Sequence, residues 1–226
     1  MAKKISIAID GPAGAGKSTI ARRLAKEMGY MYVDTGAIYR TVAYFFDLWG
    51  IAPKDIDVIT RYSDELTVNI EYDEDGLQHM IMNGIDVTDS IRTQDIGQKA
   101  SLVSAHAIVR EALLDMQRDV AKNYNVIMDG RDIGTVVLPK ATVKIFLTAS
   151  AEVRAKRRTE ELQAKGQKAK YEQILKEIQQ RDYQDTHREV APLKMSRDSI
   201  KLDTSDMDIE QVIAAMKEII AKKVGA

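Results

Sequence analysis

Short apolar runs recur along the chain and are separated mainly by longer stretches with the spacing of amphipathic helices. Five of these runs read as buried strands, at 3–10, 30–34, 125–129, 143–149 and 199–203. Buried strands that alternate with helices are typical of a parallel sheet with helices on both faces. The pattern therefore predicts a three-layer α/β fold around a five-stranded parallel sheet.

Helical spacing fills most of the chain between these strands. It predicts helices at 17–28, 35–49, 95–124 (with room for one break), 150–165, 171–188 and 209–223. Gly29 stands where glycine commonly ends a helix, and Gly50 with Pro53 closes the second helix. Helix and strand signals thus alternate in the order that a parallel sheet with helices on both faces requires.

The segment 63–87 follows a different pattern. Two alternating runs, TVNIEY (67–72) and QHMIMNG (78–84), flank the sequence EDGL. An Asp-Gly pair between alternating runs is a strong hairpin signal. We therefore expect a small antiparallel insertion here, outside the parallel sheet.

The segment GPAGAGKS matches G-x-x-x-x-G-K-[ST] at every fixed position, between a predicted strand and a predicted helix. Glycines allow the backbone to approach phosphate oxygens, and the amides at a helix start form an anion site. Lys17 can reach the β- and γ-phosphates, and the Ser18 hydroxyl can ligate Mg²⁺. The predicted triphosphate-binding residues are Gly11, Pro12, Ala13, Gly14, Ala15, Gly16, Lys17, Ser18 and Thr19. The motif alone leaves the phosphate acceptor open.

Charged residues follow the strand at 125–129. Asp129 occupies the position of an aspartate that helps hold Mg²⁺, directly or through water. Arg131 and Asp132 come next, at the carboxyl end of the strand, where ligands bind in open α/β sheets. The sequence contains no Asn-Lys pair and therefore lacks the guanine-reading motif of a GTPase.

Arginines lie in several separate segments of the chain. An acceptor that is itself a phosphate monoester carries about two negative charges and needs several cationic donors. Arg181, Asp185 and Arg188 share one helical face. The other candidates are Arg40, Arg110 and Arg131. Arg154, Arg157 and Arg158, in the most polar stretch, are likewise neighbours on one helical face.

Composition limits the alternatives. Lys and Arg number 33 against 34 Asp and Glu, a net charge of 33 − 34 = −1, which argues against a nucleic-acid binder. The absence of cysteine excludes disulfides, thiolate catalysis and cysteine zinc sites. No signal-peptide core or membrane-length apolar run stands out, so we expect a cytoplasmic protein without a membrane partner. No exposed apolar stripe stands out either, which favours a monomer.

Taken together, GPAGAGKST, DTGAIYR (34–40), GRDIGT (130–135), the Arg181–Asp185–Arg188 spacing and APL (191–193) resemble bacterial cytidylate kinases, a family of P-loop nucleoside monophosphate kinases. The resemblance runs along essentially the whole chain. It implies a single P-loop kinase domain with a core (1–35, 88–150, 190–226), a monophosphate-binding region with the insertion (36–87) and a helical lid (151–188). It also implies phosphorylation of CMP and dCMP with ATP and Mg²⁺.

The resemblance further implies roles for matching residues. Ser101, Arg110 and Asp132 would read cytosine, while Arg181 and Asp185 would hold the sugar. Arg40, Arg131 and Arg188 would bind the acceptor phosphate, and Arg154, Arg157 and Arg158 would form a lid over ATP. Lys17, Asp129, Arg131 and Arg188 would be catalytic, with Ser18 and Asp129 at the metal.

Two alternatives stay open on the sequence. The chain could be a different small-molecule P-loop kinase, acting on UMP, AMP or a metabolite. It could also be a nucleotide-binding switch without catalysis. Turnover that depends on an acceptor distinguishes the kinases from the switch, and a panel of nucleoside monophosphates distinguishes the kinases from one another.

Overall fold

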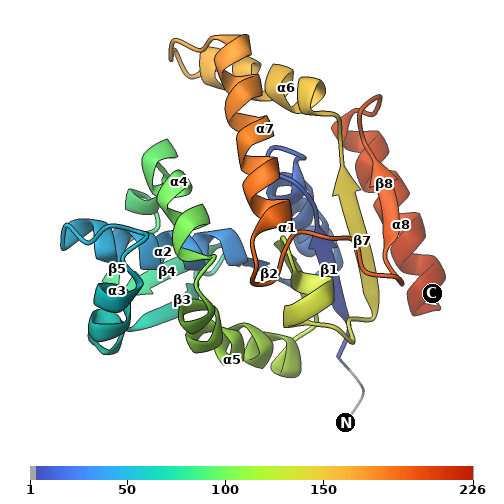
Figure 1. Ribbon diagram of the computed structural model, residues 1–226. Coiled ribbons are helices and arrows are strands. Elements are labelled where there is room, and N and C mark those ends of the chain that lie inside the picture. The colour runs from blue at the N-terminus through green and yellow to red at the C-terminus, as the bar shows by residue number, and fades with distance from the viewer. Residues whose placement is uncertain (1–3, 226) are drawn as a thin grey trace.

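A computed structural model describes residues 4–225 of the chain. Five strands form a parallel sheet in the order β2-β6-β1-β7-β8 (Figure 1). They are β1 (Ser6–Asp10), β2 (Met31–Asp34), β6 (Val126–Gly130), β7 (Val143–Thr148) and β8 (Ile200–Asp203). The predicted five-stranded parallel sheet is confirmed, although Lys3, where the first strand was expected to begin, lies outside the described residues.

Helices cover both faces of this sheet. They are α1 (Lys17–Met28), α2 (Thr35–Leu48), α4 (Gln94–Val103), α5 (Ala107–Asn123) and α8 (Ile209–Val224). On one face, Ala8 and Met128 pack with α2, α4 and α5. On the other face, Ile7, Ile9 and Ile127 pack against α1 and α8. This alternation along each strand explains why the strands are apolar throughout.

Two further helices, α6 (Ala151–Ala164) and α7 (Tyr171–His187), pack against each other beside the carboxyl end of the sheet (Figure 1). Ala155, Ile174 and Ile178 form a small apolar cluster of their own between these helices. The α6–α7 pair therefore has its own core, separate from the two apolar clusters on the sheet.

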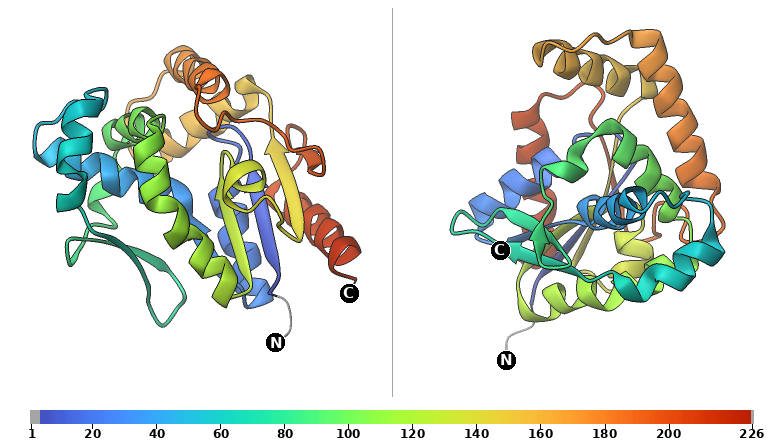
Figure 2. Two further views of the ribbon diagram at one scale, coloured as in Figure 1. Left: turned by 60° about the horizontal axis from the view of Figure 1, so that its bottom comes forward. Right: turned by 90° about the vertical axis from the view of Figure 1, so that its left-hand side faces the viewer.

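The expected antiparallel insertion is present. It consists of β3 (Val68–Tyr72), β4 (Gln78–Met82) and the short β5 (Ile85–Asp86), with β3 and β4 joined through the predicted Asp-Gly turn. Figure 2 shows this hairpin projecting beside the main sheet. Met80 and Met82 bury their side chains in the same cluster as α2. The insertion is thus packed onto the body of the protein.

Several features were not expected from the sequence. Helix α3 (Ile56–Tyr62) is only seven residues long and buries a single residue, Ile59, so its apolar periodicity is weak. A 3₁₀ turn at Ser90–Arg92 follows the insertion, and a π-helical turn at Ile133–Val137 follows β6. The 95–124 region is divided into α4 and α5, as the sequence allowed.

Candidate active site

The glycine-rich loop runs from the end of β1 to the start of α1. Gly11 has φ 152°, and a Cβ there would lie 1.9 Å from the Leu147 carbonyl oxygen. Gly16 has φ 83° and forms the N-cap of α1. Lys17 is buried, and its Nζ donates to the Pro12 carbonyl at 2.8 Å. The backbone therefore takes a path that only glycine permits at these positions.

Ser18 and Asp129 come together at the carboxyl ends of β1 and β6. The Ser18 Oγ donates to Asp129 Oδ2 at 3.0 Å, and the Tyr32 hydroxyl donates to Asp129 Oδ1 at 2.8 Å. The Thr35 hydroxyl donates to the Asp129 carbonyl at 2.8 Å. One hydroxyl and one carboxylate suit a Mg²⁺ ion that takes its other ligands from nucleotide phosphates and water. Residues 4–225 contain no cluster of three or more acidic or histidine side chains that would hold a metal alone.

Burial shifts the protonation of the groups around the loop. It lowers the pKa of Lys17, and the nearby Arg131 cation lowers it further. It raises the pKa of Asp129, and Asp34 adds to that increase. A buried lysine beside an arginine is an electrostatically unfavourable arrangement that an anion would stabilise.

Asp10 connects the glycine-rich loop to the segment after β6. Its two carboxylate oxygens accept from the Ile133 and Gly134 amides, each at 2.7 Å. These amides begin the π-helical turn that follows Arg131 and Asp132. Burial raises the pKa of Asp10 to about 6, although the two amides act in the opposite direction. Asp10 therefore fixes the backbone on which two predicted site residues stand.

Arg131, Arg181 and Asp185 form one group at the end of α7. Arg131 Nε donates to Asp185 Oδ2 at 2.8 Å, and Ser101 Oγ lies 3.4 Å from the other oxygen of this carboxylate. Burial opposes ionisation of Arg131, but Asp185 raises its pKa overall. Burial, together with Arg131, lowers the pKa of Arg181 to about 10. Among the described residues, the buried Nε of Arg181 has no hydrogen-bond partner.

Arg110, Asp132 and Arg188 form a second group. The guanidinium of Arg110 donates to Asp132 and lies 5.2 Å from the centre of the Tyr39 ring. Arg188 reaches the other Asp132 oxygen at 3.4 Å and donates twice to the Ala191 carbonyl. Ala191 has φ 48°, an unusual conformation for alanine, and its carbonyl faces the guanidinium. The structure therefore places Arg188 with the predicted base-reading residues rather than with Arg40.

Arg40 extends from α2 toward the segment that leaves the insertion. Its Nη1 donates to the Ile91 carbonyl at 3.2 Å and the Thr93 carbonyl at 3.0 Å. A Cβ at Gly97 would lie 2.8 Å from this guanidinium, so a larger residue at position 97 would displace the end of the Arg40 side chain. Burial lowers the pKa of Arg40, and the cations of Arg92, Arg131 and Arg158 contribute. Arg40 and Arg131 therefore approach the same region from different elements.

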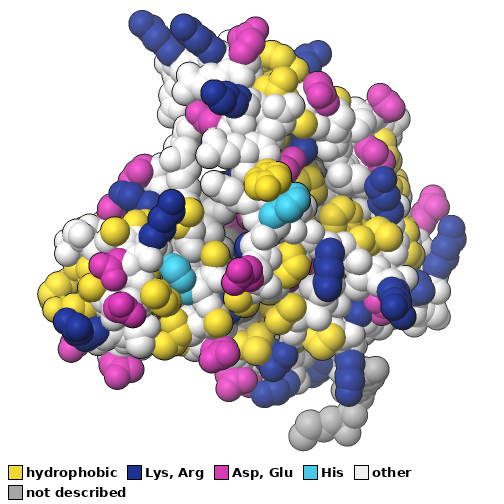
Figure 3. All heavy atoms as spheres, viewed as in Figure 1, with side chains coloured by type: hydrophobic (Ala, Val, Ile, Leu, Met, Phe, Trp, Pro, Cys, Tyr) yellow, Lys and Arg dark blue, Asp and Glu magenta, His cyan; other side chains and the backbone are white. Residues whose placement is uncertain are grey.

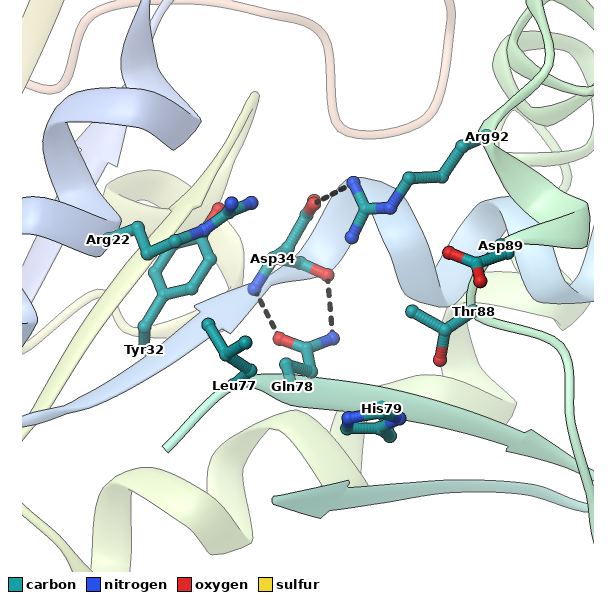
Figure 4. A pocket seen from close by; sticks show the side chains of 9 residues that line it. All are labelled: Arg22, Tyr32, Asp34, Leu77, Gln78, His79, Thr88, Asp89 and Arg92. Atoms are coloured by element: carbon teal, nitrogen blue, oxygen red, sulfur yellow. Dashed lines mark hydrogen bonds and ion pairs between the residues drawn. The ribbon is translucent and has the colours of Figure 1, made fainter. Parts of the chain in front are cut away.

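Arg92, which the motifs did not single out, lies beside Asp34 at the start of α2. It stands on the 3₁₀ turn after the insertion, and its Nη1 lies 4.0 Å from Asp34 Oδ2 (Figure 4). Its place is set by how the chain returns from the insertion to α4, and no sequence motif marks that return. Tyr32 was likewise missed, since an apolar strand gives no sign that its hydroxyl contacts Asp129.

The three α6 arginines have different surroundings. Arg154 is buried and donates to the Ala13 carbonyl of the glycine-rich loop at 3.0 Å and to both oxygens of Asp182. Arg157 instead donates to the Thr204 and Met207 carbonyls after β8. Arg158 pairs with Glu161 at the surface. Of the three, Arg154 is the one that contacts the loop.

The buried arginines distinguish this site from the outer surface. On the face that Figure 3 shows, basic and acidic side chains are interspersed. Arg110, Arg154 and Arg188, by contrast, have side chains that are 8%, 5% and 7% exposed. Residues 4–225 include no helix long and apolar enough to cross a membrane.

Comparison with known proteins gives consistent matches over the whole chain. The sequence model described as cytidylate kinase matches residues 7–222. The chain is 47% identical over 220 residues to a cytidylate kinase of Exiguobacterium sp., covering 97% of this chain and 98% of the relative. It is 48% identical over 223 residues to a cytidylate kinase of Caldicellulosiruptor saccharolyticus, covering 99% and 98%.

A solved structure of shikimate kinase from Bacteroides thetaiotaomicron is also similar, with a TM-score of 0.48 and 14% identity over 96% of this chain and 98% of that one. The sequence matches confirm the resemblance drawn from the motifs. The chain belongs to the cytidylate kinase family and is an ATP-dependent nucleotide kinase, a phosphotransferase.

Proposed function

We propose that the chain transfers the γ-phosphoryl group of ATP directly to the phosphate of CMP or dCMP, with Mg²⁺ as cofactor. The main support for this proposal is buried positive charge that is not compensated. Burial lowers the pKa of Lys17, Arg40 and Arg181, and Arg181 Nε has no hydrogen-bond partner among the described residues. Buried cations are costly unless they are paired, so the site favours a highly anionic ligand.

At the donor end, the amides of the glycine-rich loop would bind the ATP phosphates. Lys17 would stabilise charge on the transferred group, and Arg154 would hold the loop through the Ala13 carbonyl. Ser18 and Asp129 would hold Mg²⁺, which supplies further charge neutralisation at the phosphates when it is bound.

At the acceptor end, Arg40, Arg92 and Arg131 would bind the phosphate of the monophosphate. Their mutual electrostatic effects support this grouping, because the cations of Arg92 and Arg131 both lower the pKa of Arg40. A phosphate monoester is largely ionised at neutral pH, so the transfer needs no strong general base. The acceptor oxygen attacks in line with the leaving oxygen of ADP.

Asp132 would select the base. A carboxylate oxygen keeps acceptor capacity while it pairs with an arginine, so Asp132 can accept from the 4-amino group of cytosine. Arg110 and Arg188 would donate to the O2 and N3 acceptors. Uracil presents a carbonyl at the 4-position, which Asp132 would repel. Arg181 and Asp185 would hold the sugar hydroxyls, with Ser101 beside Asp185.

The α6–α7 pair would close over the bound nucleotides and exclude water, which suppresses ATP hydrolysis.

A binding measurement tests the CMP site. CMP affinity for Arg181→Ala, measured by titration calorimetry, should fall at least about 10-fold, the loss expected for a charged hydrogen-bonding group. Lys176→Ala, an exposed residue on the same helix, is the matched control. Equal CMP affinity in the wild type and the Arg181 variant would contradict the proposal.

A further inference from the structure

The free edge of β2 presents backbone groups that no strand pairs. β2 is the outermost strand on its side of the sheet. The Met31 amide bonds to the Asn125 carbonyl beside β6, so by alternation the peptide groups of Tyr32 and Asp34 face outward. An open edge with unpaired amides and carbonyls is unfavourable when it is buried.

Side chains of the insertion pair with these outward groups. The carboxamide of Gln78 accepts from the Asp34 amide at 2.7 Å and donates to the Asp34 carbonyl at 3.3 Å. The Tyr72 hydroxyl donates to the Tyr32 carbonyl at 2.9 Å. Gln78 is 8% exposed, so water does not readily replace these bonds. Figure 4 shows the Gln78 side chain facing Asp34 with both bonds.

Asp34 connects this edge to the acceptor end of the site. Its Oδ1 accepts from the Ala37 amide at 3.0 Å, which caps α2, the helix that carries Arg40. Its Oδ2 lies 4.0 Å from Arg92. Arg40 in turn donates to the Ile91 and Thr93 carbonyls, on the segment by which the chain leaves the insertion. The insertion is therefore attached to Asp34 through Gln78, and the segment by which the chain leaves it is attached to Arg40.

A pocket of about 340 Å³ lies beside this attachment, between the insertion and the β2 edge. Arg22, Leu77 and Thr88 line it together with Gln78 and Arg92 (Figure 4). The space means that close packing alone does not fix the insertion against β2 here. The hydrogen bonds of Gln78 and Tyr72 instead hold the insertion against β2.

We propose that Gln78 is a positioning residue. Its carboxamide pairs with the β2 edge as a peptide group of a neighbouring strand would, and it thereby sets the positions at which Arg40 and Arg92 meet the acceptor phosphate. The proposal rests on the proposed function for the role of these two arginines. Gln78 itself contacts neither nucleotide in this account, and its effect passes through Asp34.

Gln78→Met tests the proposal, because methionine has nearly the same size but forms neither hydrogen bond. The KM for CMP should rise about 10-fold, as expected for the loss of buried hydrogen bonds, while the KM for ATP stays within about two-fold. Asn69→Ala, on an exposed position of β3 in the same insertion, is the control and should match the wild type. A KM for CMP within two-fold of the wild type in Gln78→Met would overturn the proposal.

A second measurement tests the attachment itself. Hydrogen exchange at the Asp34 amide, followed by NMR, should be at least about 10-fold faster in Gln78→Met, while the Ile127 amide in the sheet interior keeps its protection. Unchanged protection at Asp34 would refute the attachment. If the wild type does not use CMP, the proposed function fails on its own, and this exchange measurement still decides whether Gln78 holds the β2 edge.

Discussion

The guanidinium of Arg110 donates to the carboxylate of Asp132, and both side chains are more than nine-tenths buried. Arg188 approaches the second oxygen of the same carboxylate, so one buried anion lies between two cations. Removing a partner from such a group leaves an uncompensated buried charge. The two arginines therefore hold the Asp132 carboxylate in a fixed place.

Asp132→Asn should weaken discrimination between CMP and UMP. The amide can donate to the 4-carbonyl of uracil, whereas the carboxylate repels it. We expect the ratio of kcat/KM for CMP over UMP to fall at least about 10-fold, in line with the loss of a charged hydrogen bond. Steady-state kinetics with both nucleotides measure this ratio. An unchanged ratio would show that Asp132 does not select the base.

Lys17→Ala should remove most of the turnover without unfolding the protein. We expect kcat to fall about 1000-fold, the scale for losing a key charge-stabilising group. Burial lowers the pKa of Lys17, so its charge does not favour the folded state, and the melting temperature should not decrease. A coupled ADP-release assay and a thermal melt check the two parts. Turnover near the wild-type level would contradict the role of Lys17.

Arg154→Met should impair ATP handling. Methionine keeps the apolar part of the side chain but loses the bonds to the Ala13 carbonyl and to Asp182. The KM for ATP should rise about 10-fold or more, with a smaller change for CMP. Lys156→Ala, exposed on the same helix, serves as the control and should leave both values as they are. Equal effects on both substrates would point to a general loss of structure.

Asp10 should make stability depend on pH in a defined direction. Burial raises its pKa from 3.8 to about 6, so the folded protein binds this proton more tightly than the unfolded chain. Its contribution is fully present below about pH 4 and is lost as the pH rises through about 6. Relative to Asp10→Asn, which cannot titrate, the wild type should lose about 2 kcal/mol of unfolding free energy between pH 4 and pH 6. Urea unfolding of both proteins across this range measures the difference, and a constant difference would contradict the shift.

The strands and the glycine-rich loop could be predicted because their signals are local. The apolar runs ending at Asp10 and Asp129 have lengths and flanking residues that fit buried strands, and both stand where expected. Gly29, predicted to end the first helix, has the left-handed conformation that favours glycine there (φ 65°). The family resemblance drawn from the combined motifs is confirmed by matches over the full length.

Partnerships between distant residues could not be predicted in this way. The family resemblance grouped Arg188 with Arg40 at the acceptor phosphate, whereas its hydrogen bonds in the structure go to the Ala191 carbonyl and Asp132. Arg157 bonds to carbonyls beyond β8, a contact that its helical spacing did not indicate, and its expected role over ATP stays a prediction. Helical spacing indicates which arginines lie on one face of a helix, but it does not indicate which residues that face contacts. Gln78 likewise gave no sequence signal, because its partner Asp34 lies far from it in the sequence.

Substrate choice is the most direct test of the proposed base-binding site. The purified protein should be assayed for ADP release with ATP and Mg²⁺ against CMP, dCMP, UMP and AMP. We predict that CMP and dCMP are used with clearly higher kcat/KM than UMP or AMP, since Asp132 stands between Arg110 and Arg188 where the base would bind. Preference for UMP or AMP, or release of ADP that does not depend on any acceptor, would contradict it.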